Sequence, residues 1–155
     1  MPLPSPSPLP SAKEVVRRFF AEAVDQHDVT ILGDLFTADC IIHRPEASRP
    51  ISGLEGIRRI VGAGAKLYSH VATTVHDLIA EGDRVACRLS HRATFSGEWR
   101  TRLGNQAVAG RTISWEAMAI FRLRDGKIAE QWVCRDELGM LLQLGVLQRS
   151  SDEAG

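Results

Sequence analysis

The chain has 155 residues, 44% of them hydrophobic, and it carries 19 basic and 19 acidic residues, so its formal net charge is zero. This length suits one domain with one core. The charge balance argues against a nucleic-acid or membrane-surface partner, which would require an excess of basic residues. No apolar run approaches the ~20 residues of a membrane span. We therefore expect neither a membrane-spanning segment nor a membrane-surface partner.

Three cysteines, Cys40, Cys87 and Cys134, lie far apart in the sequence. Their odd number and wide spacing favour reduced core residues over a disulfide framework or a zinc site. The first residues lack the basic and apolar regions of a signal peptide. We therefore expect a cytoplasmic protein with neither disulfides nor a bound metal.

The N-terminal third predicts an arm followed by helices. Residues 1–10 alternate proline with small residues, which favours an extended arm outside the fold. Ser11 is followed three residues later by Glu14, the spacing of a capping box at the start of a helix. Apolar residues then recur at helical spacing. Asp28 is expected to open a second, shorter helix that ends at Phe36.

The next segment predicts a short strand and a third helix. Residues 40–43 are apolar up to a histidine, and Pro45 stops the strand that they indicate. Ser52 and Glu55 give another capping signal. Apolar residues continue at helical spacing as far as Leu67, although two glycines weaken this helix.

From His70 onward, apolar residues recur with a period of two, as in strands. The expected strands are 70–80, 84–95, 111–123 and 127–135. Residues 96–110 are polar and predict a loop or lid, and residues 137–145 predict a terminal helix. Helices followed by a meander of strands indicate an α+β domain with helices on one face of an antiparallel sheet. We place this domain at 11–147 and a flexible tail at 148–155.

The last strand ends in a carboxylate. Successive side chains of a strand point to opposite faces. This divides the segment into two sets, Trp132, Cys134 and Asp136 on one face and Gln131, Val133 and Arg135 on the other. If the first set lined a pocket, Asp136 would be held as a buried general base. The alternative is that Asp136 caps the following helix.

The C-terminal block resembles the SnoaL-like polyketide cyclases, or ester cyclases, of the nuclear-transport-factor-2-like superfamily. The resemblance rests on the Asp-Gly-Lys-Ile turn at 125–128, the Glu-x-Trp at 130–132, the Asp four residues after the Trp, and Leu-Gly-x-Leu-x-Gln-Leu-Gly at 138–145. It extends from about Val15 to Leu147. It implies a curved antiparallel sheet wrapped by the N-terminal helices into a cone, and a homodimer formed through the exposed sheet face.

The resemblance also implies a function. It suggests a cofactor-free cyclase or isomerase, of lyase or isomerase type, that acts on a small, largely apolar, polyketide-like intermediate. Such an enzyme needs a base, a hydrogen-bond donor and a shaped pocket. Asp136 matches the family's catalytic aspartate. His43 follows the first short strand and is a candidate donor or acid–base partner, although a histidine bonded to the backbone is the alternative.

Histidines on the first two long strands are further candidates. His91 is a candidate donor to substrate in the pocket. His70, His76 and His91 could in principle meet at a zinc ion, but their positions lack the spacing that is familiar for zinc ligands. We therefore expect no metal and treat His76 as a solvated edge residue.

Large side chains on the strands are candidate pocket walls. These are Arg88, Trp99, Trp115 and Met118. Trp99 lies in or near the predicted lid, where an amphipathic aromatic ring can stack on a flat ligand. Gly97-Glu98-Trp99 is similar to the Gly-Glu-Phe type of the family, but residues 100–110 depart from its proline-containing link. Arg100 and Arg102 there favour an acidic or oxygen-rich substrate.

Glu116 lies within an apolar strand, where an unpaired charge is costly. It is expected to pair with Arg88 or to enter the pocket as a second carboxylate. In the second case, two carboxylates would favour an epoxide-opening cyclase or a hydrolase that activates a hydroxyl or water. A further alternative is a non-catalytic ligand-binding domain, in which Asp136 only caps a helix and the pocket is small or filled, because this superfamily hosts several functions.

Overall fold

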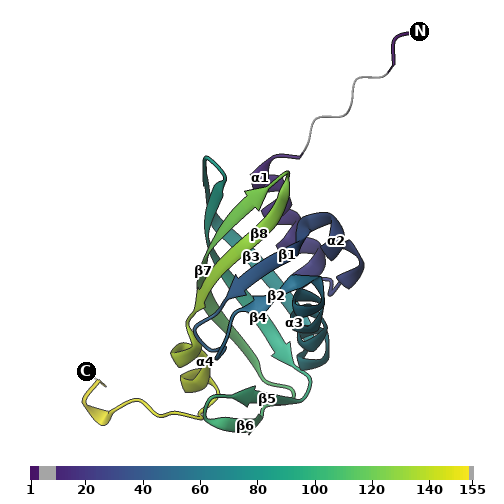
Figure 1. Ribbon diagram of the computed structural model, residues 1–155. Coiled ribbons are helices and arrows are strands. Elements are labelled where there is room, and N and C mark those ends of the chain that lie inside the picture. Colours follow the sequence, from purple (N-terminus) through teal and green to yellow (C-terminus); the bar gives the residue numbers. More distant parts are fainter. Residues whose placement is uncertain (4–9, 154–155) are drawn as a thin grey trace.

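The computed structural model describes residues 1–3 and 10–153 (Figure 1). Most of the proline-rich arm (4–9) and the last residues of the tail (154–155) lie outside the described residues. The sequence predictions for those two segments therefore stay predictions.

The first helix begins as its capping signal predicts. Helix α1 spans Ala12–Arg18, and the predicted capping box is present. The backbone N–H of Glu14 donates to Oγ of Ser11 at 3.2 Å, and the N–H of Ser11 donates to Oε2 of Glu14 at 3.2 Å. The helix continues as a π-helical segment, η1, over Phe19–Val24. This wider turn brings the helix to its end at Asp25.

The next elements lead into the sheet. Asp28 accepts a hydrogen bond from Thr30 N at 2.9 Å and opens the 3₁₀ turn η2 (Val29–Ile31), which runs into α2 (Leu32–Leu35). Strand β1 (Phe36–His43) contains the predicted strand at 40–43 but starts four residues earlier. Asp28 therefore opens a helical segment as predicted, and Phe36 already belongs to the strand.

Helix α3 (Gly53–Leu67) follows the short strand β2 (Ile51–Ser52). Its two interior glycines do not interrupt it. The side chain of Ser52 makes no capping hydrogen bond, so the predicted capping interaction there is wrong. The turn instead places Gly53 at a φ of +72°, a left-handed conformation that glycine adopts without steric cost.

Within the described residues, six strands form one sheet in the order β2-β1-β8-β7-β4-β3. The long strands are β3 (Tyr68–Glu81), β4 (Arg84–Phe95), β7 (Thr112–Arg124) and β8 (Lys127–Arg135). They pair in antiparallel fashion, as predicted. Strand β1 departs from this pattern, because it pairs parallel to β8 with His43 opposite Trp132.

The sheet curves around α1, α2 and α3 (Figure 1). A hairpin of β5 (Glu98–Thr101) and β6 (Gly104–Ala107) lies at one end of this cone, where the sequence predicted a loop or lid. The terminal helix α4 (Glu137–Gln143) lies near the same end. The predicted α+β cone is therefore confirmed.

The core fills the concave side of the sheet. Burial along β7 alternates strictly, with Trp115, Ala117, Ala119 and Phe121 inside and their neighbours outside. Cys40 and Cys87 are buried as expected, whereas Cys134 is exposed, and all three are free. Among the described residues, no helix has the length and apolar character needed to cross a membrane.

Candidate active site

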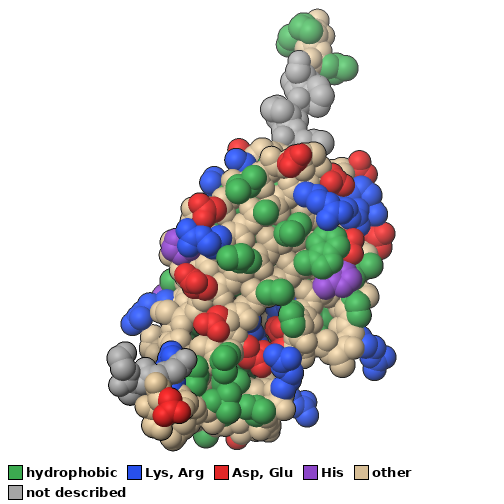
Figure 2. Space-filling view, turned by 90° about the vertical axis from the view of Figure 1, so that its left-hand side faces the viewer, with side chains coloured by type: hydrophobic (Ala, Val, Ile, Leu, Met, Phe, Trp, Pro, Cys, Tyr) green, Lys and Arg blue, Asp and Glu red, His purple; other side chains and the backbone are tan. Residues whose placement is uncertain are grey.

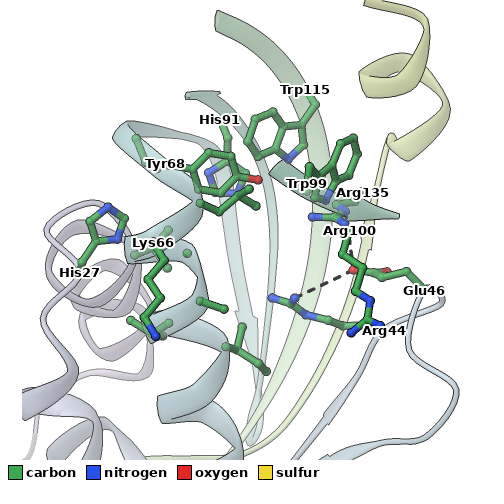
Figure 3. A pocket seen from close by; sticks show the side chains of 18 of the residues that line it. His27, Arg44, Glu46, Lys66, Tyr68, His91, Trp99, Arg100, Trp115 and Arg135 are labelled. Atoms are coloured by element: carbon green, nitrogen blue, oxygen red, sulfur yellow. Dashed lines mark ion pairs between the residues drawn. The ribbon is translucent and has the colours of Figure 1, made fainter. Parts of the chain in front are cut away.

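A cavity of about 580 Å³ opens on the concave side of the sheet, between α3, the strands and the β5–β6 hairpin (Figure 3). This volume lies in the range of small-molecule sites. Aromatic side chains of Tyr68, Trp99 and Trp115 form part of its wall, and polar groups including His91 also reach it. The cavity is therefore large enough for a bicyclic or tricyclic ligand.

Strand β8 contributes to the cavity through the face that does not carry Asp136. Val133 and Arg135 line the cavity, and Gln131 is buried on the same side. Cys134 and Asp136 are exposed. The alternation predicted from the sequence is correct, but the set that enters the cavity is the one that contains Arg135.

Asp136 occupies the N-cap position of α4. Its Oδ1 accepts a hydrogen bond from Gly139 N at 2.8 Å, and the side chain lies outside the residues that line the cavity. A Cβ atom added at Gly139 would clash with Oδ2 of Asp136 in its present position, so a larger residue there would require the carboxylate to shift. The capping interpretation of Asp136 is thus realised in the structure.

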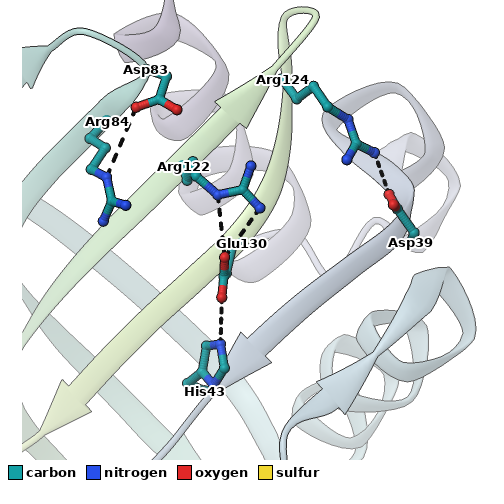
Figure 4. A network of polar contacts seen from close by, with 7 residues as sticks. All are labelled: Asp39, His43, Asp83, Arg84, Arg122, Arg124 and Glu130. Atoms are coloured by element: carbon teal, nitrogen blue, oxygen red, sulfur yellow. Dashed lines mark hydrogen bonds and ion pairs between the residues drawn. The ribbon is translucent and has the colours of Figure 1, made fainter.

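His43 also lies outside the cavity, in a network on the convex face of the sheet (Figure 4). Its Nε2 is 2.8 Å from Oε2 of Glu130, and its ring stacks on Trp132 at 5.3 Å between centroids. Arg122 donates to Oε1 of Glu130 at 3.1 and 3.2 Å. The hydrogen bond with His43, followed by that with Arg122, lowers the pKa of Glu130.

His91 lines the cavity and belongs to a chain of three hydrogen-bonded side chains, Asp25, Thr73 and His91. Thr73, His91 and Trp115 are direct neighbours across β3, β4 and β7. Nδ1 of His91 lies 2.8 Å from Oγ1 of Thr73, and Oγ1 of Thr73 lies 2.5 Å from Oδ1 of Asp25. The backbone N–H of Thr73 donates to Oδ2 of Asp25 at 2.9 Å.

This arrangement fixes the proton positions of the imidazole. A carboxylate accepts hydrogen bonds, so the Thr73 hydroxyl donates its one proton to Asp25. Oγ1 of Thr73 then acts as the acceptor for His91, and Nδ1 of His91 carries the proton. Nε2, at the other side of the ring, is left with a free lone pair. His91 thus has the tautomer that can accept a proton from a ligand in the cavity.

The π-helical segment positions Asp25 for this contact. The N–H of Asp25 donates to the carbonyl of Phe20 at 2.9 Å, an i→i−5 bond. Single π turns are frequent at functional sites because the extra residue changes the direction of the side chains that follow. Here the extra residue ends the helix with a carboxylate against β3.

The surroundings of His91 disfavour its charged form. Burial, and then the nearby guanidinium groups of Arg135 and Arg44, lower the pKa of His91 to about 4. The ring packs against Trp115 and Phe20, with centroids 5.2 and 6.2 Å away. His91 is therefore neutral near pH 7 and available as an acceptor.

Tyr68 supplies a hydroxyl group to the same cavity (Figure 3). Its ring stacks on Trp115 at 5.9 Å between centroids. Burial raises the pKa of Tyr68, although Arg135 and Arg44 oppose this effect. The phenol therefore keeps its proton and can donate a hydrogen bond to a ligand oxygen.

The structure separates the remaining candidates into two groups. Trp99 and Trp115 are buried and line the cavity. Met118, which is 63% exposed, and Glu116 and Arg88 point to the convex face instead. The prediction that these three line the pocket is wrong because they have the opposite parity to Trp115 and Cys87.

Arg88 also has a different partner from the one predicted. Its Nε donates to Oδ2 of Asp77 at 2.7 Å, whereas its cross-strand neighbour on β7 is Met118. Glu116 is opposite Ser90. His76, as expected, is exposed, and its ring bonds to Oγ of Ser90 at 2.9 Å. Within the described part of the chain, no group of three or more His, Cys, Asp or Glu side chains could hold a metal ion.

Several residues of the site were not predicted from the sequence. Asp25, Thr73 and Tyr68 carried no motif, Arg44 was not singled out, and Arg135 was noted only on the strand face opposite to that of Asp136. The sequence did contain one indication for Thr73. It lies on the strand that pairs with the strand of His91, and the alternation along that strand points its side chain inward. The contact with Asp25 joins residues 48 positions apart and needs the fold to be known.

Comparisons with known proteins agree with this architecture. The model of the SnoaL-like polyketide cyclase family matches residues 14–144, so the chain belongs to this family. A search of curated proteins found no match. TsrD from Streptomyces laurentii is 28% identical, with a TM-score of 0.74 over 86% of this chain and 94% of that chain.

Two further structures are similar. IdmH from Streptomyces antibioticus, assigned as a polyketide cyclase, is 28% identical, with a TM-score of 0.72 over 85% of this chain and 96% of that chain. A protein from Acidithiobacillus ferrooxidans with the same assignment has a TM-score of 0.77 at 17% identity, covering 92% and 100% of the two chains, which shows the fold. The nuclear-transport-factor-2-like cone is thus shared, and family membership supports an enzyme of polyketide-cyclase type that acts on small molecules.

Proposed function

We propose that the chain is a cyclase or isomerase of a polyketide-like intermediate in which His91 is the general base. The observation that carries this proposal is the Asp25–Thr73–His91 chain of hydrogen bonds, because it leaves Nε2 unprotonated on a histidine that lines the cavity. A base positioned in this way contributes roughly 10²–10⁴-fold to a proton transfer.

The mechanism follows from the positions of two groups. Nε2 of His91 removes a proton from a carbon flanked by two carbonyl groups, and the hydroxyl of Tyr68 donates to the enolate oxygen that forms. The enolate carbon attacks a further carbonyl group of the same molecule, other than the two that flank it, and closes a ring. The imidazolium then returns the proton to the new alkoxide, so that no cofactor is consumed.

The chain of hydrogen bonds also serves the protonated intermediate. When His91 carries two protons, its Nδ1–H still donates to Thr73, which donates to Asp25. The carboxylate thereby stabilises the imidazolium through the hydroxyl. Because the pKa of His91 is low in the free protein, the proposed substrate is an acidic 1,3-dicarbonyl and not a simple ketone.

The cavity favours this proposal over the two alternatives. Water activation by two carboxylates was expected to use Glu116 with Asp136, and both lie outside the cavity. A binding domain was expected to combine a capping Asp136 with a small or filled pocket. Asp136 does cap α4, but the cavity is open and about 580 Å³ in volume.

Deuterium exchange tests the proposal without knowledge of the natural substrate. The measurement is the rate at which a 2-substituted β-keto amide exchanges its acidic C–H in D₂O, followed by proton NMR. We expect exchange above the uncatalysed rate with the wild type and at least ~100-fold less catalysis with His91→Gln, since the general base is removed. Equal exchange by the two proteins would refute the proposal.

We also propose, as the family resemblance implied, that two copies pair through the convex sheet face. Ile79 and Ile120 are 66% and 43% exposed and lie in one cross-strand row with Trp132. Apolar side chains lie between charged ones across this face (Figure 2). Light scattering on the wild type and on Ile120→Lys tests the pairing. A monomeric wild type would contradict it.

A further inference from the structure

Two arginines from different strands converge on one glutamate at the side of the cavity (Figure 3). Arg44 directly follows β1, and Arg135 ends β8. Oε1 of Glu46 lies 3.5 Å from Nε of Arg135 and 4.0 Å from Nη1 of Arg44. We call these three residues the arginine site.

The contacts within the arginine site are too long to satisfy its donors. Hydrogen bonds from N–H to oxygen have lengths of 2.7–3.2 Å. The Nε atoms of Arg44 and Arg135 are buried and have no hydrogen-bond partner among the residues that the structure describes. Buried donors without acceptors are costly. Glu46 therefore holds the site loosely and leaves it open to a better acceptor.

The arginine site also has a surplus of positive charge. Two guanidinium groups face one carboxylate, and burial followed by the charge of Arg135 lowers the pKa of Arg44. Glu137 lies 3.8 Å from Arg135, but it also lies 3.3 Å from Arg102. In a chain of zero formal net charge, this local excess indicates a place for an anion.

The walls beside the arginine site are flat and apolar. The guanidinium of Arg135 lies over the ring of Trp99, 5.6 Å from its centroid. Arg135 is opposite Ala117, two residues from Trp115 along β7, and Trp115 is the cross-strand neighbour of His91. The cavity thus has a cationic end and an aromatic middle, and His91 lies beyond that middle.

We propose that Arg44 and Arg135 bind a carboxylate group of the substrate, which makes the substrate a flat, largely apolar acid. Guanidinium groups match carboxylates in a planar, two-point geometry. Glu46 occupies this position in the free protein and moves aside when the acid binds. The inference deepens the proposed function, because it takes the cavity as the substrate site and places the reacting carbon on the side of His91.

Isothermal titration calorimetry with 2-naphthoate, and with neutral 2-naphthamide as the matched probe, tests the arginine site. We expect the wild type to bind the acid at least ~10-fold more tightly than the amide, as loss of a charged hydrogen bond would give. Arg135→Met should remove this preference, because the affinity for the acid should fall by more than the affinity for the amide. Glu46→Gln should tighten binding of the acid, because the competing carboxylate is gone.

Two controls make the result specific. Arg88→Met removes an arginine from the convex face and should keep the full preference for the acid. Arg135→Lys keeps the charge but loses the planar fork and should lie between the wild type and Arg135→Met. The variants are compared only if their circular dichroism spectra match that of the wild type. If Arg44→Met also folds, it should behave as Arg135→Met does.

Equal affinity of the wild type for the acid and the amide would overturn the inference. The same loss of preference in Arg88→Met would also overturn it, because the effect would then be one of net charge. His91→Gln separates the two proposals. If it binds 2-naphthoate as the wild type does and still catalyses exchange, the proposed function fails while the arginine site stands.

Discussion

The hydroxyl of Thr73 lies 2.8 Å from Nδ1 of His91, and the same hydroxyl is bonded to Asp25. This relationship turns an imidazole on a strand into a base of defined tautomer. The groups come from the end of a π-helical segment, from β3 and from β4. The tautomer of this cavity-lining histidine is therefore set by the tertiary fold.

Replacing Thr73 tests whether its hydroxyl group orients His91 for the proton transfer. Thr73→Val keeps the shape of the side chain but removes both hydrogen bonds of the hydroxyl. We expect exchange to fall about 10-fold, since one hydrogen bond contributes about 1–1.5 kcal/mol. Thr73→Ser, measured in parallel by proton NMR, should restore most of the rate. Equal rates for Thr73→Val and the wild type would show that the chain of hydrogen bonds has no role.

Stability should decrease in mild acid because the pKa of His91 is lowered to about 4 in the folded protein. Above pH 6.5, His91 is neutral in both the folded and the unfolded chain and contributes nothing. Between pH 6.5 and 4, the unfolded chain takes up a proton that the folded protein refuses, so unfolding is favoured as the pH falls. The loss at pH 4 is of the order of 3 kcal/mol.

Urea unfolding of the wild type and of His91→Gln at pH 7 and pH 4.5 measures this effect. The free energy of unfolding of the wild type should fall more steeply with acidification than that of the variant. Parallel curves for the two proteins would show that His91 is not held neutral by its surroundings.

Binding of an acid should raise the pKa of His91. Arg135 and Arg44 both lower it in the free protein, after burial. A carboxylate bound between the two guanidinium groups would offset their charge and favour the imidazolium. NMR titration of the His91 ring with and without 2-naphthoate should show a higher pKa with the acid bound. No change, or a decrease, would contradict the location of the acid beside both arginines.

His43 should be dispensable for turnover. It lies on the convex face, where it bonds to Glu130. His43→Gln should leave exchange within about 2-fold of the wild type and reduce stability by less than about 1 kcal/mol, as is usual for pairs near the surface. The pKa of Glu130 is lowered in the folded protein, so this network stabilises the fold fully above pH 4.5, and its contribution is lost as the pH falls below 4.5 and through the lower pKa of the folded carboxyl group. A large loss of activity without unfolding would place His43 in the mechanism after all.

The fold was largely predictable because it depends on local patterns. The capping box at Ser11, the alternation along β4 and the turn at Asp125 and Gly126 each act over a few residues. Alternation also divided β8 correctly into two faces. It did not say which face is concave, since this depends on the curvature of the whole sheet. For that reason Met118 was assigned to the wrong side, as were Asp136 and Glu116 in the interpretations that placed them in the pocket.

The site depended on contacts that no local pattern encodes. His91 and Trp115 have the inward parity, and the sequence singled out both. Their partner Asp25 is 48 residues before Thr73, and a π turn directs it to the sheet. Arg44 and Arg135 meet because β1 pairs parallel with β8, whereas the sequence suggested an antiparallel sheet throughout.

The most direct test of the account compares His91→Gln with Asp136→Asn in the deuterium exchange of the β-keto amide. Asn preserves the oxygen that caps α4, so both variants should fold, and circular dichroism checks this. The account predicts at least ~100-fold less catalysis for His91→Gln and a rate within a few-fold of the wild type for Asp136→Asn. The opposite result, with Asp136→Asn inactive and His91→Gln unimpaired, would contradict it.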